Sequence, residues 1–174
     1  DTNSFSDISA DAWYNNAVST LTNAGILSGY PDGTFRPDAP ITRAELAAIA
    51  SRFDELSGGE SRLTDISGHW AEEYINSAYS KGWVDGYPDG TFRPDQNITR
   101  AEVMTLVNRV LERAVDIDGM LEDMVTWTDN QPDSWFYEAV QEATNSHDYS
   151  REEGEEFETW TEITPPRDWT ELEK

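Results

Sequence analysis

The sequence predicts a mainly α-helical protein of repeated units with long ordered loops and little β structure. The phrase Gly-Tyr-Pro-Asp-Gly-Thr-Phe-Arg-Pro-Asp occurs at 29–38 and again at 86–95, each time leading into Ile-Thr-Arg-Ala-Glu. Between residues 29–45 and 86–102, 15 of 17 positions are identical. Amphipathic helical segments flank both copies. Since packing alone needs only apolar residues at the right period, such identity indicates a demanding loop geometry or a repeated binding surface.

Composition narrows the possible partners. The 174 residues carry a net charge of −23, and 114–174 hold 18 of the 35 acidic side chains. An acidic chain repels phosphates and anionic lipids, so we expect no nucleic acid partner, and without an apolar run of 18 residues no membrane insertion. The lack of cysteine excludes a disulfide framework and suits an exported protein. The start at Asp1, without Met or signal peptide, predicts a mature or excised chain.

The first unit should contain two helices joined by the repeated loop. We expect a helix over 13–24, because apolar side chains recur there with helical spacing. These are Trp13, Ala17 and Leu21, with Val18 and Ala24 beside them on the same face. Ser9 or Asp11 is expected to cap its start and Gly25 to end it in a left-handed conformation.

The loop and the second helix follow from local signals. Pro31-Asp32-Gly33 is strong turn chemistry, and Phe35 is expected to anchor the loop in the core. Thr42 and Glu45 form a capping box. The helix after it should end near Asp54 and present an apolar stripe. The stripe comprises Leu46, Ile49, Ala50 and Phe53.

The second unit repeats this plan, with Trp70 starting its first helix, Phe92 as its loop anchor and a capping box at Thr99 and Glu102. We expect Gly82 to end the first helix, and the connection 113–124 to hold a helical turn.

The third unit begins as a copy and then departs. Trp127-Thr128-Asp129 and 135–140 match the earlier helix entrances, but neither the loop nor the capping box follows Asn145. We interpret Ile163-Thr164 as a remnant of the capping-box approach, with a short helix possible around 168–173.

The predicted organisation is therefore 1–56, 57–113 and 114–174. The last is a divergent repeat with an acidic C-terminal extension. We expect the three repeats to form one compact unit.

Arg43 and Arg100 need an explanation beyond capping, because the helix macrodipole disfavours a cation in the first turn. One interpretation is a salt bridge to a neighbouring repeat. The other is a small positive pocket that accepts a carboxylate-bearing ligand. Trp13, Trp70 and Trp135 are similarly open to two interpretations, as core anchors or as half-exposed platforms for a sugar ring.

These motifs resemble those of the S-layer homology domain family. The resemblance is close over 5–53 and 63–112 and partial over 127–143. It implies three repeats in a pseudo-threefold arrangement, with a central helix bundle carrying prongs and ligand grooves between repeats. It also implies a secreted module of the bacterial cell envelope or surface layer. Such a module anchors a surface protein non-covalently to a pyruvylated secondary cell wall polysaccharide or to peptidoglycan, and other surface-layer subunits are further partners.

The resemblance also assigns site residues. One groove would pair Arg43 with Trp70 and another Arg100 with Trp135. A third would face Trp13 without a matching arginine, since Arg167 is a poor substitute, so we expect two competent grooves at most. The remaining predicted ligand-binding residues are Asp7, Asp65, Asp129, Gly29, Tyr30, Gly86 and Tyr87.

Two other functions are weighed against this one. A calcium-dependent assembly module is compatible with many carboxylates, although no Asp-x-Asp-x-Asp-Gly loop is present. A glycan-degrading enzyme could use paired acids such as Asp32 and Asp38, but turn chemistry already explains both. We therefore expect no catalytic residues, no metal and no cofactor.

Overall fold

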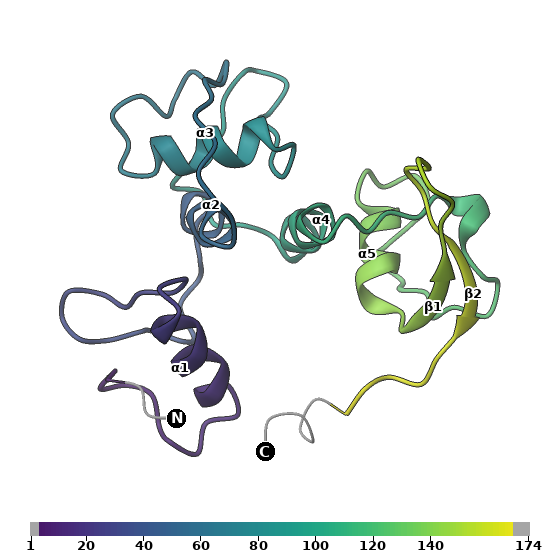
Figure 1. Cartoon of the computed structure of the whole chain (residues 1–174), viewed down its shortest axis with the longest axis horizontal. Coiled ribbons are helices and arrows are strands. Elements are labelled where there is room, and N and C mark those ends of the chain that lie inside the picture. The colour runs from purple at the N-terminus through teal and green to yellow at the C-terminus, as the bar shows by residue number, and fades with distance from the viewer. Residues whose placement is uncertain (1–3, 169–174) are drawn as a thin grey trace. The chain divides into compact units, whose positions relative to one another are not determined.

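The computed structural model describes residues 4–168, which divide into two packing units, 4–97 and 98–167, with Asp168 assigned to the first (Figure 1). The first unit contains α1 (Asn15–Asn23), α2 (Arg43–Ser51) and α3 (Glu72–Ser80). The second contains α4 (Arg100–Val110), the 3₁₀ helix η1 (Ile117–Gly119), α5 (Tyr137–Thr144), β1 (His147–Ser150) and β2 (Thr159–Ile163). The mainly α-helical prediction is confirmed, whereas the three-repeat division and its pseudo-threefold arrangement stay predictions.

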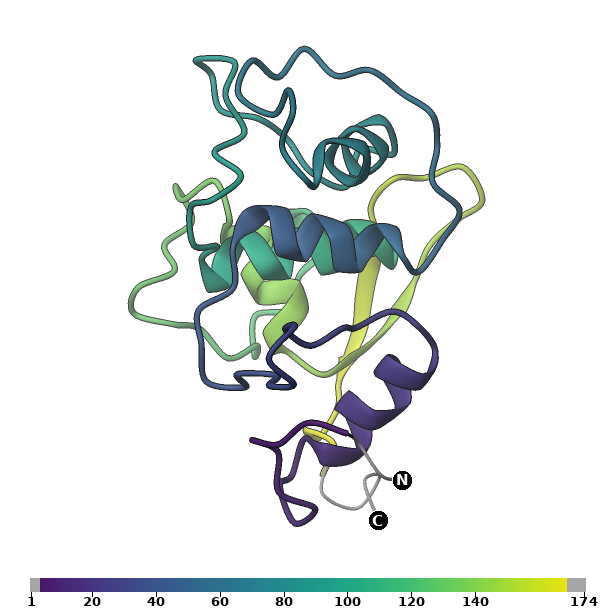
Figure 2. The same cartoon turned by 90° about the vertical axis from the view of Figure 1, so that its left-hand side faces the viewer.

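In the first unit α2 packs across α3. Figure 1 shows α2 end-on with α3 running across it, and Figure 2 shows the reverse, so the two helices cross. Small side chains fill their contact, with Ala44, Ala47 and Ala78 at most 1% exposed and Ile75 fully buried. They let the two backbones approach closely.

The predicted apolar stripe of α2 is confirmed only in part. Ala50 is buried, but Leu46 and Ile49 are only half-buried and Phe53 is 56% exposed, whereas Ala44, Ala47 and Ala48 are buried. The face predicted for α1 is confirmed only in part, since Val18 is buried as expected while Trp13 and Ala17 are exposed.

Helix ends follow local sequence closely in α2 and α4. Thr42 Oγ1 accepts a hydrogen bond from the Glu45 amide at 3.1 Å, and the Glu45 carboxylate accepts one from the Thr42 amide at 2.7 Å. Thr99 and Glu102 form the same box. Gly25 and Gly82 adopt the predicted left-handed conformation, with φ of 74° and 72°.

The predicted cap of the first helix is wrong. α1 begins at Asn15 and has no side-chain cap, and Ser9 instead accepts a hydrogen bond from the Asp11 amide in the turn before it.

The second unit ends in a feature that the sequence did not predict. β1 and β2 pair antiparallel with an irregularity between Asp148 and Tyr149, and α5 packs against α4. Ile163 ends β2, and the Thr164 amide donates to the Ser146 carbonyl at 2.8 Å, so the interpretation of Ile163-Thr164 as a capping remnant is wrong.

Two further predictions concern this unit and the residues after it. The helical turn expected in 113–124 is confirmed as η1. The short helix expected around 168–173 lies outside the described residues, apart from Asp168. None of the described helices has the length and apolar character needed to cross a membrane.

Candidate ligand-binding groove

Each repeated loop is held by one aspartate from the start of its own repeat. Asp7 accepts the amides of Phe35 and Arg36 at 2.8 and 2.7 Å. Asp65 accepts those of Phe92 and Arg93 at 2.7 and 2.8 Å. These bonds lower the pKa of Asp7, the Phe35 amide most of all. The two aspartates predicted as ligand groups thus already have a structural task.

The loop arginines adopt a conformation that side chains rarely take. Arg36 and Arg93 have φ of 59° and 58°, in the left-handed region. Arg36 lies over the Tyr30 ring at 3.9 Å and Arg93 over the Tyr87 ring at 3.7 Å. The strained backbone at these two arginines is stabilised by the hydrogen bonds that Asp7 and Asp65 accept from their amides. Stacking of each guanidinium on its tyrosine ring stabilises it further.

Asp32 and Asp89 brace the same loops from within. Hydrogen bonds from the Thr34 hydroxyl, then from Arg36, lower the pKa of Asp32 to about 2. Those from the Thr91 hydroxyl and amide lower the pKa of Asp89 to about 2. A carboxyl with so low a pKa is a poor general acid, so Asp32 fits loop structure rather than catalysis.

The predicted glycines and tyrosines are also built into the loops. A Cβ at Gly29 would overlap the Phe5 ring and lie 2.7 Å from the Thr34 carbonyl oxygen, and one at Gly86 would overlap Leu63. The Tyr30 hydroxyl donates to Glu45 at 3.3 Å, and burial followed by Glu45 raises the pKa of Tyr30.

The Phe anchors differ between the two loops. Phe92 is 1% exposed, as predicted, while Phe35 is half-buried and packs on Phe5 with ring centroids 5.3 Å apart.

Arg43 is buried in the loop of the second repeat. It is 8% exposed, its Nε donates to the Phe92 carbonyl at 2.8 Å, and its Nη2 donates to the Asp85 carbonyl at 3.2 Å. Its guanidinium also lies over the rings of Phe92 and Tyr87, at 4.6 and 4.9 Å. Arg43 therefore joins the α2 start to the next loop, which is closer to the structural interpretation than to the ligand-pocket one.

Arg100 occupies the same place in α4 but is exposed, and it makes no hydrogen bond or ion pair with the residues that the structure describes. Asp129, the counterpart of Asp7 and Asp65, is likewise exposed and has no loop to hold. The loop phrase that Arg43 and the two aspartates contact does not recur after residue 95. The predicted groove of Arg100 with Trp135 stays a prediction.

A cavity with a volume of about 900 Å³ lies against the first loop. Its walls come from 27–41, from one stripe of α2 and from Trp70 of the second repeat. We call this cavity the loop groove. The α2 stripe consists of Glu45, Ala48, Ile49 and Arg52. The structure thus brings Trp70, Tyr30 and Gly29 together as predicted, but it places Arg43 outside the groove.

The cations of the loop groove are Arg36 and Arg52, which the sequence analysis did not select. Arg36 is paired with Asp32 at 2.8 Å but remains about half exposed. Arg52 donates to the Ile26 carbonyl at 3.0 Å and lies 5.5 Å from the Tyr74 ring centre. A signal was present, because both recur 57 residues later as Arg93 and Arg109.

The three helix-entrance tryptophans are exposed, which favours platforms over core anchors. Trp13, Trp70 and Trp135 are 75%, 59% and 69% exposed. Each of them contacts aromatic neighbours. Trp13 packs edge-on with Tyr14, and Trp135 with Phe136, each with ring centroids 5.4 Å apart. The ring centroids of His69 and Tyr74 lie 5.6 and 6.5 Å from that of Trp70. A braced, exposed indole can stack on a sugar ring with little loss of side-chain freedom.

The second unit contains a buried charged cluster instead of a groove. Arg113 pairs with Glu158 at 2.7 Å and with Glu142 at 2.8 Å. His147 Nε2 lies 3.1 Å from Glu158, and Trp160, 2% exposed, donates to Glu142 at 3.0 Å. Burial raises the pKa of Glu142, whereas the bonds from Arg113 and His147 outweigh burial and lower that of Glu158.

The carboxylates of Glu142 and Glu158 and the imidazole of His147 could ligate a metal, since their atoms lie within 4.8 Å of one another. The Arg113 guanidinium is already paired with both carboxylates and offsets one of their two negative charges. The cluster thus ties Arg113 and α5 to the hairpin.

A family model described as S-layer homology domain matches residues 4–47 and 62–104. The chain is 40% identical over 156 residues to a cellulosome-anchoring protein of Acetivibrio thermocellus. The matched region covers 86% of the chain and 34% of that protein. The chain is 41% identical over 122 residues to cell surface glycoprotein 1 of the same organism, covering 63% of the chain and 5% of that protein.

A surface layer protein of Brevibacillus choshinensis is 32% identical over 117 residues, covering 63% of the chain and 10% of that protein. The chain therefore spans about a third or less of these relatives.

Proposed function

Since the chain belongs to the S-layer homology domain family, we propose that it is a non-catalytic module of the bacterial cell envelope. It anchors a surface protein to the cell wall by binding an acidic wall polysaccharide in the loop groove. The names of its relatives, which include anchoring and surface layer proteins, support this place and role.

The observation that carries the proposal is the composition of the loop groove. The exposed indole of Trp70 lines a cavity that Arg36 and Arg52 also line. An indole stacks on sugar rings, and a guanidinium binds a carboxylate through paired hydrogen bonds. The charge of Arg36 is offset by Asp32, at 2.8 Å, and Arg52 shares the lining with Glu45. This combination suits a sugar that bears a carboxylate, such as a pyruvylated amino sugar.

The two alternatives have less support. Among the described residues, the close carboxylate and imidazole group of Glu142, His147 and Glu158 has Arg113 as its counterion, which disfavours a calcium-dependent assembly. The acids proposed for an enzyme, Asp32 and Asp38, belong to the loop, and Asp32 is bonded to Thr34 and Arg36.

Co-sedimentation with purified cell walls tests the proposal. Trp70→Ala should weaken wall binding about tenfold or more, since stacking on an aromatic ring contributes on the order of 1–2 kcal/mol. Arg52→Gln should also weaken it, and added salt should reduce the difference between Arg52→Gln and the unaltered chain. Trp13→Ala is the matched control, because Trp13 is also an exposed helix-entrance indole but does not line the loop groove.

The wall preparation identifies the polymer. Walls stripped of their secondary polysaccharide should lose the chain if that polymer is the ligand, and should retain it if peptidoglycan is. Equal binding by Trp70→Ala and Trp13→Ala, with both folded by circular dichroism, would show that the loop groove is not the site.

A further inference from the structure

The start of α2 is bound to the second loop by three donor groups. The Arg43 amide donates to the Gln96 carbonyl at 2.9 Å, and the Ala44 amide donates to the Pro94 carbonyl at 3.0 Å. The Arg43 guanidinium donates to two further carbonyls, within 85–92. A helix leaves its first amides without acceptors of its own, so the loop completes the helix start. We call this arrangement the internal joint.

The start of α4 has the same donors but no acceptors for them. Arg100 and Ala101 occupy the positions of Arg43 and Ala44, directly after an identical capping box. Arg100 is exposed, and neither its side chain nor the amides of Arg100 and Ala101 donate to any residue that the structure describes. These donors have no loop to bind in their own chain order, because the loop phrase does not recur after residue 95.

The first loop has the matching acceptors but no donors for them. The four carbonyls equivalent to those of the internal joint accept no hydrogen bond within the described part of the chain. They belong to Ser28, Phe35, Pro37 and Ala39, and all four residues line the loop groove. The loop anchors reflect this difference, since Phe92 is 1% exposed beneath the internal joint and Phe35 is only half-buried.

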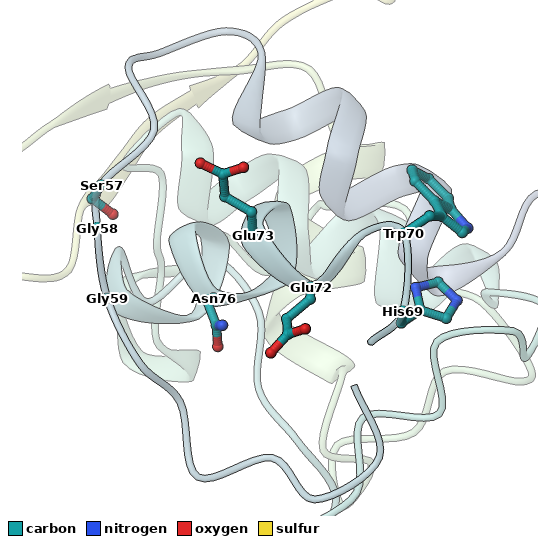
Figure 3. Close-up of a pocket in the computed structure, with 8 residues that line it drawn as sticks. All are labelled: Ser57, Gly58, Gly59, His69, Trp70, Glu72, Glu73 and Asn76. Atoms are coloured by element: carbon teal, nitrogen blue, oxygen red, sulfur yellow. The ribbon is translucent and has the colours of Figure 1, made fainter. Parts of the chain in front are cut away.

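The loop groove is open at the place that corresponds to the position of Arg43 on the second loop. The Arg43 guanidinium lies over the rings of Tyr87 and Phe92, whose equivalents in the first loop line the loop groove. Trp70, which Figure 3 shows beside His69 just before α3, is the only lining residue from outside 27–52. No helix start therefore fills the loop groove in the described structure.

The arginines of the first loop do not exclude a further guanidinium. Arg36 is paired with Asp32 at 2.8 Å. The second loop contains the same pair, Arg93 with Asp89 at 3.1 Å, and still binds Arg43. The acceptors are backbone carbonyls, so they depend on the course of the loop and not on its side chains.

We infer that a second copy of this chain docks on the first by binding its α4 start, with Arg100, in the loop groove. The partner is a second copy because the two surfaces are the unmatched halves of the internal joint. Since they are different surfaces of one chain, the contact is head-to-tail and can repeat along a row of copies. Self-association does not depend on the proposed function, but a wall polysaccharide in the loop groove would compete with it.

Sedimentation equilibrium of the whole chain, without cell walls, tests the inference. In about 0.15 M salt, which screens repulsion between acidic copies, the average mass should rise above that of one chain between about 10 μM and about 1 mM protein. Arg100→Gln should weaken association about tenfold, because it removes hydrogen bonds from a charged donor. Arg167→Gln is the matched control, since Arg167 is another exposed arginine of the second unit. The mass of one chain at every concentration, or equal losses in both variants, would overturn the inference.

Amide hydrogen exchange locates the contact. The amides of Arg100 and Ala101 should become protected as the protein concentration rises, whereas those of Arg43 and Ala44 should be protected at every concentration by the internal joint. Equal protection of the Arg100 amide at all dilutions would place its acceptor in the same chain and overturn the inference, as would association without any change at this amide.

Wall co-sedimentation separates this inference from the proposed function. If Trp70→Ala and Trp13→Ala bind walls equally while the unaltered chain self-associates through Arg100, the proposed function fails and the head-to-tail contact stands. If Trp70→Ala releases the chain from walls while the unaltered chain keeps the mass of one copy, the proposed function stands and the head-to-tail contact fails.

Discussion

The two repeats and the segment 113–163 close their structures in different ways. In each repeat an aspartate holds a long loop through two backbone amides, and a capping box starts the next helix. In 113–163 a hairpin closes over a buried cluster of Arg113, Glu142, His147 and Glu158. Hydrogen bonds from backbone amides to exposed aspartates stabilise the loops, whereas the hairpin depends on charges that its fold removes from water.

The arginine at one position of the repeated motif differs in its surroundings between the two copies. Arg43 and Arg100 occupy the same helical position, but Arg43 is buried in the loop of the following repeat and Arg100 is exposed. The next repeat decides which role applies, because a full loop follows Arg43 and none follows Arg100.

The largest effect is expected in the buried cluster. Arg113→Met removes the guanidinium between Glu142 and Glu158 and leaves buried carboxylates without their counterion, so it should cost about 3 kcal/mol of unfolding free energy. Urea denaturation followed by circular dichroism measures this change. Arg100→Met is the control and should change stability by less than about 0.5 kcal/mol. Similar losses in both variants would mean that the cluster does not stabilise the hairpin.

A smaller effect separates the two helix-start arginines. Arg43→Ala removes charged hydrogen bonds to the carbonyls of Phe92 and Asp85 and should cost about 2 kcal/mol. Arg100→Ala should be nearly neutral in the same urea titration. If Arg43→Ala is neutral as well and also weakens wall binding, Arg43 is a ligand residue and its buried position is not the functional one.

The smallest effect is the response of the loops to acid. The folded pKa of Asp32 and of Asp89 is about 2, below the ordinary 3.8, so the folded state favours their ionised forms. Their contribution to stability is present above pH about 4 and is lost as the pH falls towards 2. The melting temperature should fall over that window, and less steeply in the double variant Asp32→Asn, Asp89→Asn. Asp38→Asn, at an exposed site, serves as the control and should keep the slope of the unaltered chain.

The loops and caps were predictable because their determinants are close in sequence. Thr42 and Glu45 are three residues apart, and Asp32 bonds to Thr34, so the motif contains both partners. The groove cations could not be chosen in this way. In the sequence Arg52 cannot be told apart from the other arginines of the helices. Only the folded structure shows that its side of α2 lines a cavity with the first loop and Trp70. The hairpin of the third repeat was missed because Arg113 and Glu158 meet over 45 residues.

The helices, the repeated loops and the family were predictable from the sequence, since they depend on turn chemistry, capping and helical spacing. Which face of α2 is buried, which arginines line a cavity and which arginine is buried became clear only from the folded structure. The physical reason is that burial is shared between distant segments: a guanidinium is desolvated only where another part of the chain brings carbonyls and rings to cover it.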